Sequence, residues 1–443
     1  MNSQTEIGAH QSAPTPDRCF LFLQPHPSGF GRAILREMDR RNITYRIINV
    51  SLGDFIYRFG FKATNYIGKV RNWRTYLEAF IDEHGITDIV YYSDQRPYHR
   101  IARAVAYQRG LRAFAYEFGY FRPDWITLER SGMGVFSHFP EDPALIRRLA
   151  EDLEANDPEG FYPHTFFAEA FNEVVYNFIP VFFPYLFHHY RRDRLYHPIR
   201  DYPSYVPRLL RSGKKNREAS RTIEALTKSD AQYFVVPMQM QGDYQVRRCS
   251  HYPHLREMIE EVIGSFAENA AKDIKLVFKI HPLDNNIEDW AGIIERTAYH
   301  HNCSERVTTI DGGNLNRLLG SCAGVILVNS TTGITALQAG IPVKVLGIAI
   351  YDIAGLSHQG SLDTFWTDPE KPDKTLMEAF SKLMKASIQI KGNFFNPEGK
   401  EVGARHFVDR LIEDKVNGHG AFVEPPPRVA KAKRMGVPMT YEI

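Results

Sequence analysis

A polar turn in the second half of the chain contains the residue types best suited to chemistry. It follows the apolar segment Gly324–Val328 and consists of Asn329, Ser330, Thr331, Thr332 and Gly333. The pattern predicts a buried strand, a tight turn and a short helix, Thr332–Ala339. The N–H groups at a helix N-terminus are unpaired and lie at the positive end of the helix dipole. The turn is therefore either an anion site, usually for phosphate, or an ordinary Ser/Thr cap.

Two more polar segments follow predicted strands in the same half. Gln239 and Asp243 come after the strand Gln232–Val236, and His281-Pro282 comes directly after the next strand. The carboxyl ends of parallel strands meet at one sheet edge, where such sheets bind ligands. There an imidazole and hydroxyls can hold a phosphate, and a carboxylate can act as a base or a nucleophile. Asp243 by itself suits a turn or a helix cap equally well.

The elements that must position these residues alternate between apolar strands and amphipathic helices, the pattern of a parallel sheet. The predicted strands of this half are Gln232–Val236, Lys275–Ile280, Val307–Ile310, Gly324–Val328 and Val343–Leu346. The predicted helices are His254–Asn269, Ile287–His300, Leu315–Leu319 and Thr332–Ala339. Two further helices, Thr375–Met384 and Arg405–Ile412, are expected to return toward the first half.

The first half of the chain repeats this alternation. Its predicted strands are Cys19–Leu23, Tyr45–Val50, Asp88–Tyr92 and Arg112–Tyr116. The loops after three of these strands, 24–31, 93–99 and 117–129, are expected to face a ligand. No G-x-G-x-x-G motif is present, so nothing supports a dinucleotide site. The simplest fold is α/β, with two Rossmann-like domains facing each other across a cleft.

The middle of the chain fits neither pattern. Phe161–Tyr190 is dense in Phe and Tyr, and Arg191–Arg221 holds about ten Lys and Arg residues against three acidic ones. Aromatic residues beside a basic run suit an anionic membrane surface. The alternative is a set of helices packed on the domains with a solvated basic face. Because Pro180 and Pro184 interrupt the aromatic run, we expect most of that run to be packed, and we favour a membrane role for the basic run.

Composition sets the remaining bounds. A chain of 443 residues is long enough for two domains, and a formal charge of +2 does not point to nucleic acid as a partner. The four cysteines lack metal-ligand spacing, which fits a reducing compartment. The first 17 residues contain no apolar signal-peptide core, and no run of about 18 apolar residues is present to span a membrane.

Together these motifs resemble the bacterial capsule polysaccharide biosynthesis β-Kdo glycosyltransferases of the KpsS/LipB type. The short motifs are Gln239-x-x-x-Asp243, His281-Pro282 and Asn329-Ser330-Thr331 followed by Gly340-x-Pro342-Val343. The longer segments Ser93–Arg100, Tyr116–Glu129 and Tyr351–Trp366 are more specific. Two positions depart from the family pattern, the loop Gln24–Gly29 and Phe118, and both lie in the expected acceptor half.

The resemblance implies a GT-B-like fold and transfer of β-linked Kdo, with retention, from CMP-β-Kdo to a phosphatidylglycerol-type lipid. Retention is most simply explained by two inversions, hence by a carboxylate nucleophile. Asp243 would be that nucleophile, Gln239 would position the sugar and Glu117 would be the base. His281, Pro282, Asn329, Ser330, Thr331, Thr332 and Lys279 would bind CMP and the sugar. Asp94, Arg96 and Arg122 would lie on the acceptor side, with Lys279 or Arg96 as the cation for the Kdo carboxylate. No cofactor or metal is expected, because a monophosphate leaving group can be held by N–H groups and His281.

The strand and helix patterns divide the chain, and the resemblance suggests the role of each part and a location. We expect a disordered tail at 1–17, an acceptor domain at 18–155, a helical linker at 156–225, a CMP-sugar domain at 226–415 and a tail at 416–443. The protein would be cytoplasmic and peripheral on the inner face of the inner membrane, beside a second Kdo transferase and the capsule export machinery. The alternatives are a sialyl-type CMP-sugar transferase and a non-catalytic assembly or export factor that binds the lipid linker.

Overall fold

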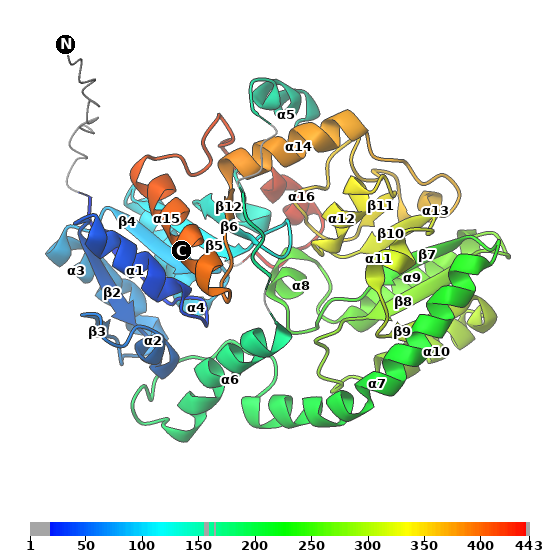
Figure 1. Cartoon of the computed structure of the whole chain (residues 1–443), viewed down its shortest axis with the longest axis horizontal. Coiled ribbons are helices and arrows are strands. Elements are labelled where there is room, and N and C mark those ends of the chain that lie inside the picture. The colour runs from blue at the N-terminus through cyan, green and yellow to red at the C-terminus, as the bar shows by residue number, and fades with distance from the viewer. Residues whose placement is uncertain (1–17, 155–158, 164, 440–443) are drawn as a thin grey trace, which may run out of the picture.

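A computed structural model describes residues 18–154, 159–163 and 165–439 of the chain. The expected N-terminal tail, 1–17, lies outside these described residues. Within them the chain forms two α/β domains, each built on its own sheet (Figure 1). The predicted α/β fold with two Rossmann-like domains is confirmed.

The first domain is built on a seven-stranded sheet with the strand order β12-β6-β5-β4-β1-β2-β3. Its first five strands in chain order are parallel and both faces are covered, as expected for a sheet with crossover helices. Leu21 and Leu23 pack under α3 (Trp73–His84) and α4 (Pro97–Gln108), whereas Phe20 and Phe22 pack under α1 (Phe30–Arg40) and α15 (Pro397–Ile412). The elements are β1 (Phe20–Phe22), α1 (Phe30–Arg40), β2 (Tyr45–Asn49), α2 (Leu52–Tyr57), β3 (Thr64–Asn65), α3 (Trp73–His84), β4 (Asp88–Tyr92), α4 (Pro97–Gln108) and β5 (Arg112–Phe118).

The segment 117–129 is not the loop that we predicted. Its first two residues end strand β5, and its last five belong to strand β6 (Trp125–Arg130), which pairs antiparallel with β5, with Glu117 opposite Thr127. The connection between the two strands is only six residues long, from Gly119 to Asp124, so the apolar residues that follow fold back along β5. Glu117 therefore lies near the end of a strand and is held by the sheet. The short α5 (Pro143–Ala150) comes next and packs against α14 (Lys374–Ser387).

The second domain is built on a five-stranded parallel sheet with the order β11-β10-β7-β8-β9. Alternate residues of its strands again point to opposite apolar layers, such as Val235 on one face and Phe234 on the other. The elements are β7 (Tyr233–Pro237), α8 (Tyr244–Cys249), α9 (Leu255–Asn269), β8 (Lys275–Ile280), α10 (Trp290–His300), β9 (Val307–Asp311), α11 (Leu315–Leu319), β10 (Gly324–Leu327), α12 (Thr332–Gln338), β11 (Val343–Val345), α13 (Leu362–Phe365) and α14 (Lys374–Ser387).

After α14 the chain returns to the first domain, so the predicted boundary at residue 415 is wrong. Strand β12 (Gln389–Lys391) pairs antiparallel with β6 and completes the first sheet. Helix α15 (Pro397–Ile412) then packs on α1, because its apolar residues Phe407, Val408 and Leu411 belong to the core layer under that helix. We expected the chain to return to the first half, but we did not expect one of its segments, β12, to become a strand of the first sheet.

The residues after 415 are not the tail that we predicted either. Helix α16 (Arg428–Arg434) packs near the domain boundary, where Ala432 and Val437 contact an apolar cluster with Val135, Cys249 and Ile348. Arg428 is buried and donates hydrogen bonds to the carbonyls of Phe139, Pro140 and Ile350. Buried guanidinium donors of this kind fix the segment in place.

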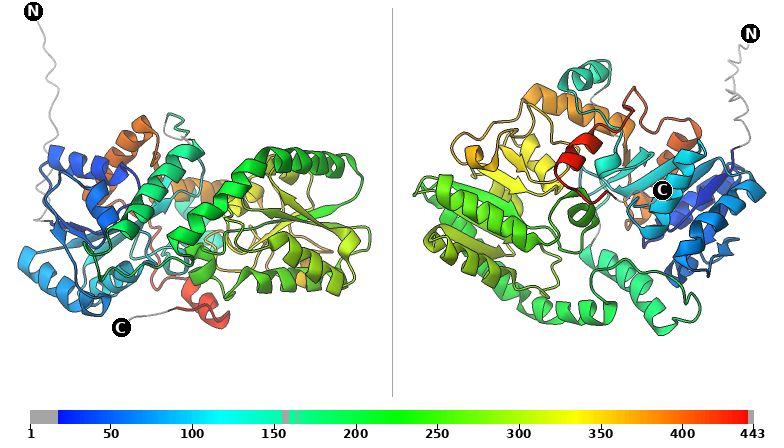
Figure 2. Two further views of the ribbon diagram at one scale, coloured as in Figure 1. Left: turned by 90° about the horizontal axis from the view of Figure 1, so that it is seen from below. Right: turned by 180° about the vertical axis from the view of Figure 1, so that it is seen from behind.

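The predicted linker consists of α6 (Phe166–Phe182) and α7 (Pro198–Lys228), which lie along one side of the molecule (Figures 1 and 2). Helix α6 packs on α2, and the last turns of α7 pack on the second sheet near β9. Contrary to prediction, α6 runs through Pro180, and Phe167, Phe171 and Phe182 are exposed. Within the described residues, no helix is long and apolar enough to span a bilayer.

Candidate functional site

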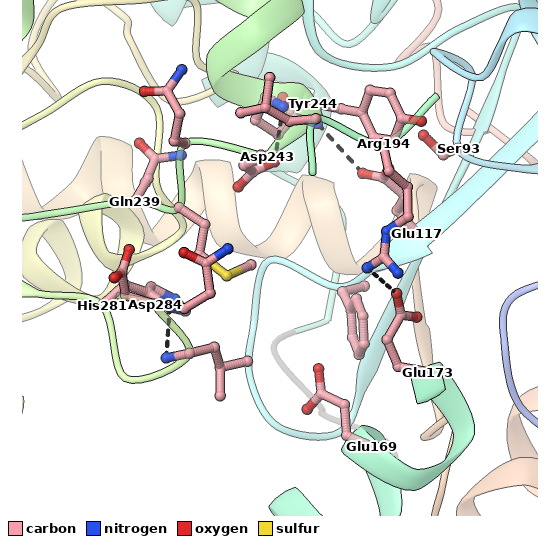
Figure 3. Close-up of a pocket in the computed structure, with 18 of the residues that line it drawn as sticks. Ser93, Glu117, Glu169, Glu173, Arg194, Gln239, Asp243, Tyr244, His281 and Asp284 are labelled. Carbon is pink, nitrogen blue, oxygen red and sulfur yellow. Dashed lines mark hydrogen bonds and ion pairs between the residues drawn. The ribbon is translucent and has the colours of Figure 1, made fainter. Parts of the chain in front are cut away.

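Three loops of the second sheet lie next to one another because β7 is flanked by β10 and β8. They follow the carboxyl ends of these strands and carry Asp243, His281 and Ser330. Together with loops of the first domain and with α6 and α7, they line a cleft of about 1250 Å³. Figure 3 shows the side chains of Asp243, Gln239, His281 and Glu117 around this cleft. The geometric prediction that these motifs share one sheet edge is confirmed.

Asp243 is the N-cap of helix α8. Its Oδ1 accepts a hydrogen bond from the backbone N–H of Gln245 at 2.9 Å. Burial raises the pKa of the carboxyl above its ordinary value, although the Gln245 N–H, the Gln239 amide and the charge of Arg122 act in the opposite direction. Asp243 is thus both a helix cap and a poorly solvated carboxylate at the cleft.

Gln239 and Asn329 hold two of the loops together. Gln239 Nε2 donates to Asn329 Oδ1 at 3.0 Å, and the Asn329 N–H donates to Gln239 Oε1 at 3.1 Å. Asn329 Nδ2 also donates to the carbonyl of Gln245 at 2.8 Å. Both side chains are buried, and they join the loops after β7 and β10 to helix α8. Asn329 therefore positions its neighbours, since its amide nitrogen and oxygen are both engaged.

His281 is a neutral hydrogen-bond donor toward the cleft. Its Nδ1 accepts from the backbone N–H of Leu283 at 3.1 Å, so the ring proton resides on Nε2. Burial lowers the pKa of His281 to about 4, and the charges of Arg208, Lys279 and Arg122 add to this effect. A neutral imidazole with Nε2–H donates to an anionic oxygen without needing to be protonated.

The hydroxyl turn lies at the same sheet edge as His281, on the other side of the loop that follows β7. Ser330 Oγ accepts from the N–H of Thr332 at 3.2 Å, and Tyr351 donates from its hydroxyl to the carbonyl of Ser330. A side chain at Gly333 would collide with Tyr351, because a Cβ there would lie 2.4 Å from the Tyr351 hydroxyl. Ser330, Thr331 and Thr332 are half-buried and line the cleft.

Glu117 enters the cleft from the first domain and meets α8. Gln245 Nε2 donates to Glu117 Oε2 at 3.4 Å. Burial raises the pKa of Glu117 to about 7, with the negative charges of Asp94 and Asp243 adding to the rise. A carboxyl with a pKa near neutrality suits proton transfer at physiological pH.

The three residues expected on the acceptor side differ in their surroundings. Arg96 lines the cleft, donates to the hydroxyl of Tyr176 at 3.3 Å and lies over the ring of Tyr92. Arg122 lines it as well; its guanidinium lies 4.4 Å from the centre of the Phe118 ring and has no ion-pair partner among the described residues. Asp94 is buried, accepts from Arg103 at 2.9 Å and does not line the cleft. Asp94 thus influences Glu117 only through its charge.

Lys279 is less able to bind a sugar carboxylate than we expected. Its ammonium donates to the carbonyl of Gly312, the side chain is buried, and burial lowers its pKa. Pro282 remains exposed at the cleft next to His281. Of the cations proposed for a sugar carboxylate, Lys279 is therefore the weakest, because its one charge is already engaged.

Several cleft residues were missed by sequence reasoning. Helix α6 contributes Glu169 and Glu173, and Glu173 accepts from Arg194 at 3.0 Å (Figure 3). The (i, i+4) spacing of the two glutamates on a predicted helix was the available signal. A second group, Gln24 with Tyr176 and Tyr190, is joined by hydrogen bonds from the Gln24 amide. Nothing local predicts this group, because its members come from distant parts of the chain.

Comparison with known proteins places these motifs in one family. A family model described as "Capsule polysaccharide biosynthesis protein" matches residues 87–395. The capsule polysaccharide modification protein LipB of Neisseria meningitidis is 31% identical over 72% of this chain and 78% of its own length. The capsule polysaccharide export protein KpsS of Escherichia coli is 30% identical over 71% of this chain and 80% of its own length.

Solved structures with a related arrangement include two from Thermosulfurimonas dismutans. The KpsC β-Kdo 2,7-transferase covers 90% of this chain and 99% of its own, at 13% identity and a TM-score of 0.42. The KpsC β-Kdo 2,4-transferase covers 76% of this chain and 94% of its own, at 15% identity and a TM-score of 0.36.

Proposed function

The chain belongs to the family of capsule polysaccharide biosynthesis proteins, and we propose that it is a retaining glycosyltransferase. It would transfer Kdo from CMP-β-Kdo to a phosphatidylglycerol-type lipid and so begin the linker of a capsular polysaccharide. One observation carries this proposal: two carboxyls with raised pKa values, Asp243 and Glu117, enter one cleft from facing domains and share contacts with Gln245. Two carboxylates of this kind support double displacement.

In the first step Asp243 attacks the anomeric carbon of Kdo. A bond forms between its carboxylate oxygen and this carbon, and the bond from the carbon to the CMP phosphate oxygen breaks. CMP leaves with the bonding electrons. Burial favours this step, since a poorly solvated carboxylate loses little hydration on attack.

Negative charge builds up on the CMP phosphate as the bond to the sugar breaks, and this charge must be stabilised. The neutral His281 can donate from Nε2, and the Ser330, Thr331 and Thr332 hydroxyls lie at the same edge. Preorganised donors of this type act without a proton having to be exchanged. We therefore expect no requirement for a metal ion.

In the second step Glu117 acts as the base. It takes the proton of an acceptor hydroxyl, the hydroxyl oxygen bonds to the anomeric carbon, and the bond from this carbon to Asp243 breaks. Two inversions leave the configuration retained. Glu117 suits the role of the base because its pKa of about 7 lies near neutral pH.

The Kdo carboxylate needs a cation, and Arg122 suits this role best. Its guanidinium faces the cleft and has no ion-pair partner in the described part of the chain, whereas the Lys279 ammonium is bonded to Gly312. A guanidinium also binds a carboxylate through two parallel hydrogen bonds. Arg96 also lines the cleft from the first domain and is left for the acceptor phosphate.

The test is mass spectrometry of products formed from CMP-Kdo and a short-chain phosphatidylglycerol. We expect one added Kdo and an equal amount of free CMP. Asp243→Asn should lower the rate at least about 10³-fold, because the nucleophile is lost. This variant keeps an oxygen that caps α8, so its stability and CMP affinity should be unchanged, whereas Asp243→Ala also loses the cap, worth about 1 kcal/mol.

Three results would contradict the proposal. Transfer from CMP-sialic acid but not from CMP-Kdo would indicate the sialyl-type alternative. Tight lipid-linker binding with no CMP release would indicate an assembly or export factor. Near-native transfer by Asp243→Asn would exclude the double-displacement step.

A further inference from the structure

Exposed apolar side chains gather on one part of this molecule. Most of the large apolar side chains that are exposed among the described residues lie between positions 161 and 210. Phe161 precedes α6, and the others belong to α6, to α7 and to the segment 183–197 between these helices. Phe55 and Phe59, which are also exposed, lie in and just after α2, the helix that packs on α6. Apolar patches of such extent on a protein surface mark an interaction site.

On α6 the apolar residues form one continuous stripe. Its members recur every three or four positions and therefore share a face of the helix: Phe167, Phe171, Val174, Phe178 and Phe182. The opposite face contains Tyr176, which is buried and hydrogen-bonds Asp54 and Gln24 of the first domain. The stripe thus points away from the domain that carries the helix.

On α7 the corresponding stripe changes from apolar to basic along the helix. The exposed residues that share one face are Ile199, Pro203, Val206, Leu210, Lys214, Arg217 and Arg221. The opposite face is directed to the protein, because Arg208 and Lys215 pair with Asp311 and because Ala219 and Ile223 are buried.

Both stripes border the cleft. Phe167 and Val174 of α6 and Val206 of α7 line its mouth, and the two helices lie along the side of the molecule that is seen from below in Figure 2. A ligand that entered the cleft between these helices would pass the apolar stripes.

We propose that the α6 and α7 stripes form a docking surface for an anionic lipid bilayer. The apolar residues enter the boundary between headgroups and acyl chains, and Lys214, Arg217 and Arg221 contact anionic headgroups. Charge complementarity along one helix face selects an anionic membrane as the occupant. The inference deepens the proposed function and rests on it, since a lipid acceptor must reach the cleft from a membrane.

This surface differs from the one that the basic run predicts. Of that run, Arg194 pairs with Glu173, and Arg208 and Lys215 pair with Asp311. These charges are used inside the protein, so fewer remain for lipid headgroups. Apolar insertion therefore supplies most of the affinity, and binding should persist in part at high salt.

The test is cosedimentation of the full chain with phosphatidylglycerol or phosphatidylcholine vesicles, without donor. The combined variant Phe167→Ser, Phe171→Ser, Ile199→Ser and Leu210→Ser should lower binding to both vesicle types at least about tenfold. The variant Lys214→Gln, Arg217→Gln and Arg221→Gln should lose the preference for phosphatidylglycerol and keep the remaining binding. Tyr107→Ser with Tyr299→Ser is the matched control, because both side chains are exposed elsewhere.

Native-like vesicle binding by the apolar variant would overturn the inference. A second result would also overturn it: the native chain does not bind vesicles and is a dimer, and the apolar variant is a monomer. The surface would then join two copies of the chain. Transfer to a detergent-dispersed acceptor is measured separately. If the native chain transferred no Kdo to this acceptor, the proposed function would be contradicted, and the result of the vesicle experiment would still stand.

Discussion

At the scale of single residues, the cleft combines two carboxyls and an imidazole whose pKa values all move against their charged forms. Burial raises the pKa of Asp243 and that of Glu117, and it lowers the pKa of His281 to about 4. Desolvation is the shared cause, and it disfavours each charged form. At neutral pH, His281 is therefore uncharged and Glu117 is close to half-protonated.

The pH dependence of transfer should report Glu117. Because the base acts when deprotonated, kcat/KM should rise through about pH 7 and then level off. Gln245→Leu removes a donor that stabilises the carboxylate, so the midpoint should move to higher pH. Rates measured from pH 5.5 to 9, a span chosen to bracket a midpoint of about 7, check this. A flat profile, or an unchanged profile in Glu117→Gln, would assign the base to another group.

At the scale of elements, helix α7 supports the phosphate side of the site. Arg208 donates to the carbonyl of His281 at 2.9 Å and to Asp311 Oδ1 at 2.6 Å. Tyr205 donates to the carbonyl of Leu283 at 3.1 Å. The helix thereby fixes the loop after β8 from outside the sheet. The segment that exposes the apolar surface on one side orients His281 on the other.

Removing the Arg208 contact should weaken binding of CMP. In Arg208→Met the His281 loop loses its anchor, and we expect affinity for CMP to fall by about 1–2 kcal/mol. Arg211→Met, an exposed position one turn further along α7, is the control and should bind as the native chain does. Titration calorimetry with CMP compares the three proteins. Equal affinities would show that the loop keeps its position without the helix.

At the scale of the whole molecule, three contacts between segments distant in the chain hold the two domains around the cleft. Helix α5 packs on α14, strand β12 joins the first sheet, and α16 packs against Cys249 at the end of α8. Arg428 of α16 donates to three carbonyls from two separate segments. Asp243 at the start of α8 therefore depends on residues near the C-terminus.

Replacing Arg428 should destabilise the protein. In Arg428→Met three buried carbonyls lose their donor, and the free energy of unfolding should fall by about 2–4 kcal/mol. Arg434→Met makes the same change at an exposed position of the same helix and should change stability little. Urea denaturation of both variants checks this. A similar stability for the two would mean that α16 packing, rather than Arg428, holds this segment.

Much of the fold could be predicted because local patterns determine it. Lys275–Ile280 and Leu315–Leu319 were predicted to the residue, since apolar periodicity and a Gly stop mark such elements. The segment after Glu117 was taken for a loop, because pairing of β6 with β5 is decided between strands. The addition of β12 to the first sheet was not predicted for the same reason, since β12 pairs with residues more than 250 positions away in the chain.

The sequence by itself determined which polar residues end the strands of the second sheet, because the order of strands and helices follows from chain pattern and parallel pairing. It therefore placed Asp243, His281 and Ser330 on one edge. Only the tertiary structure decided that Glu117 meets Gln245, that Lys279 is engaged and that α6 turns its phenylalanines outward. Burial and electrostatic surroundings depend on residues distant in the chain, and no local pattern contains them.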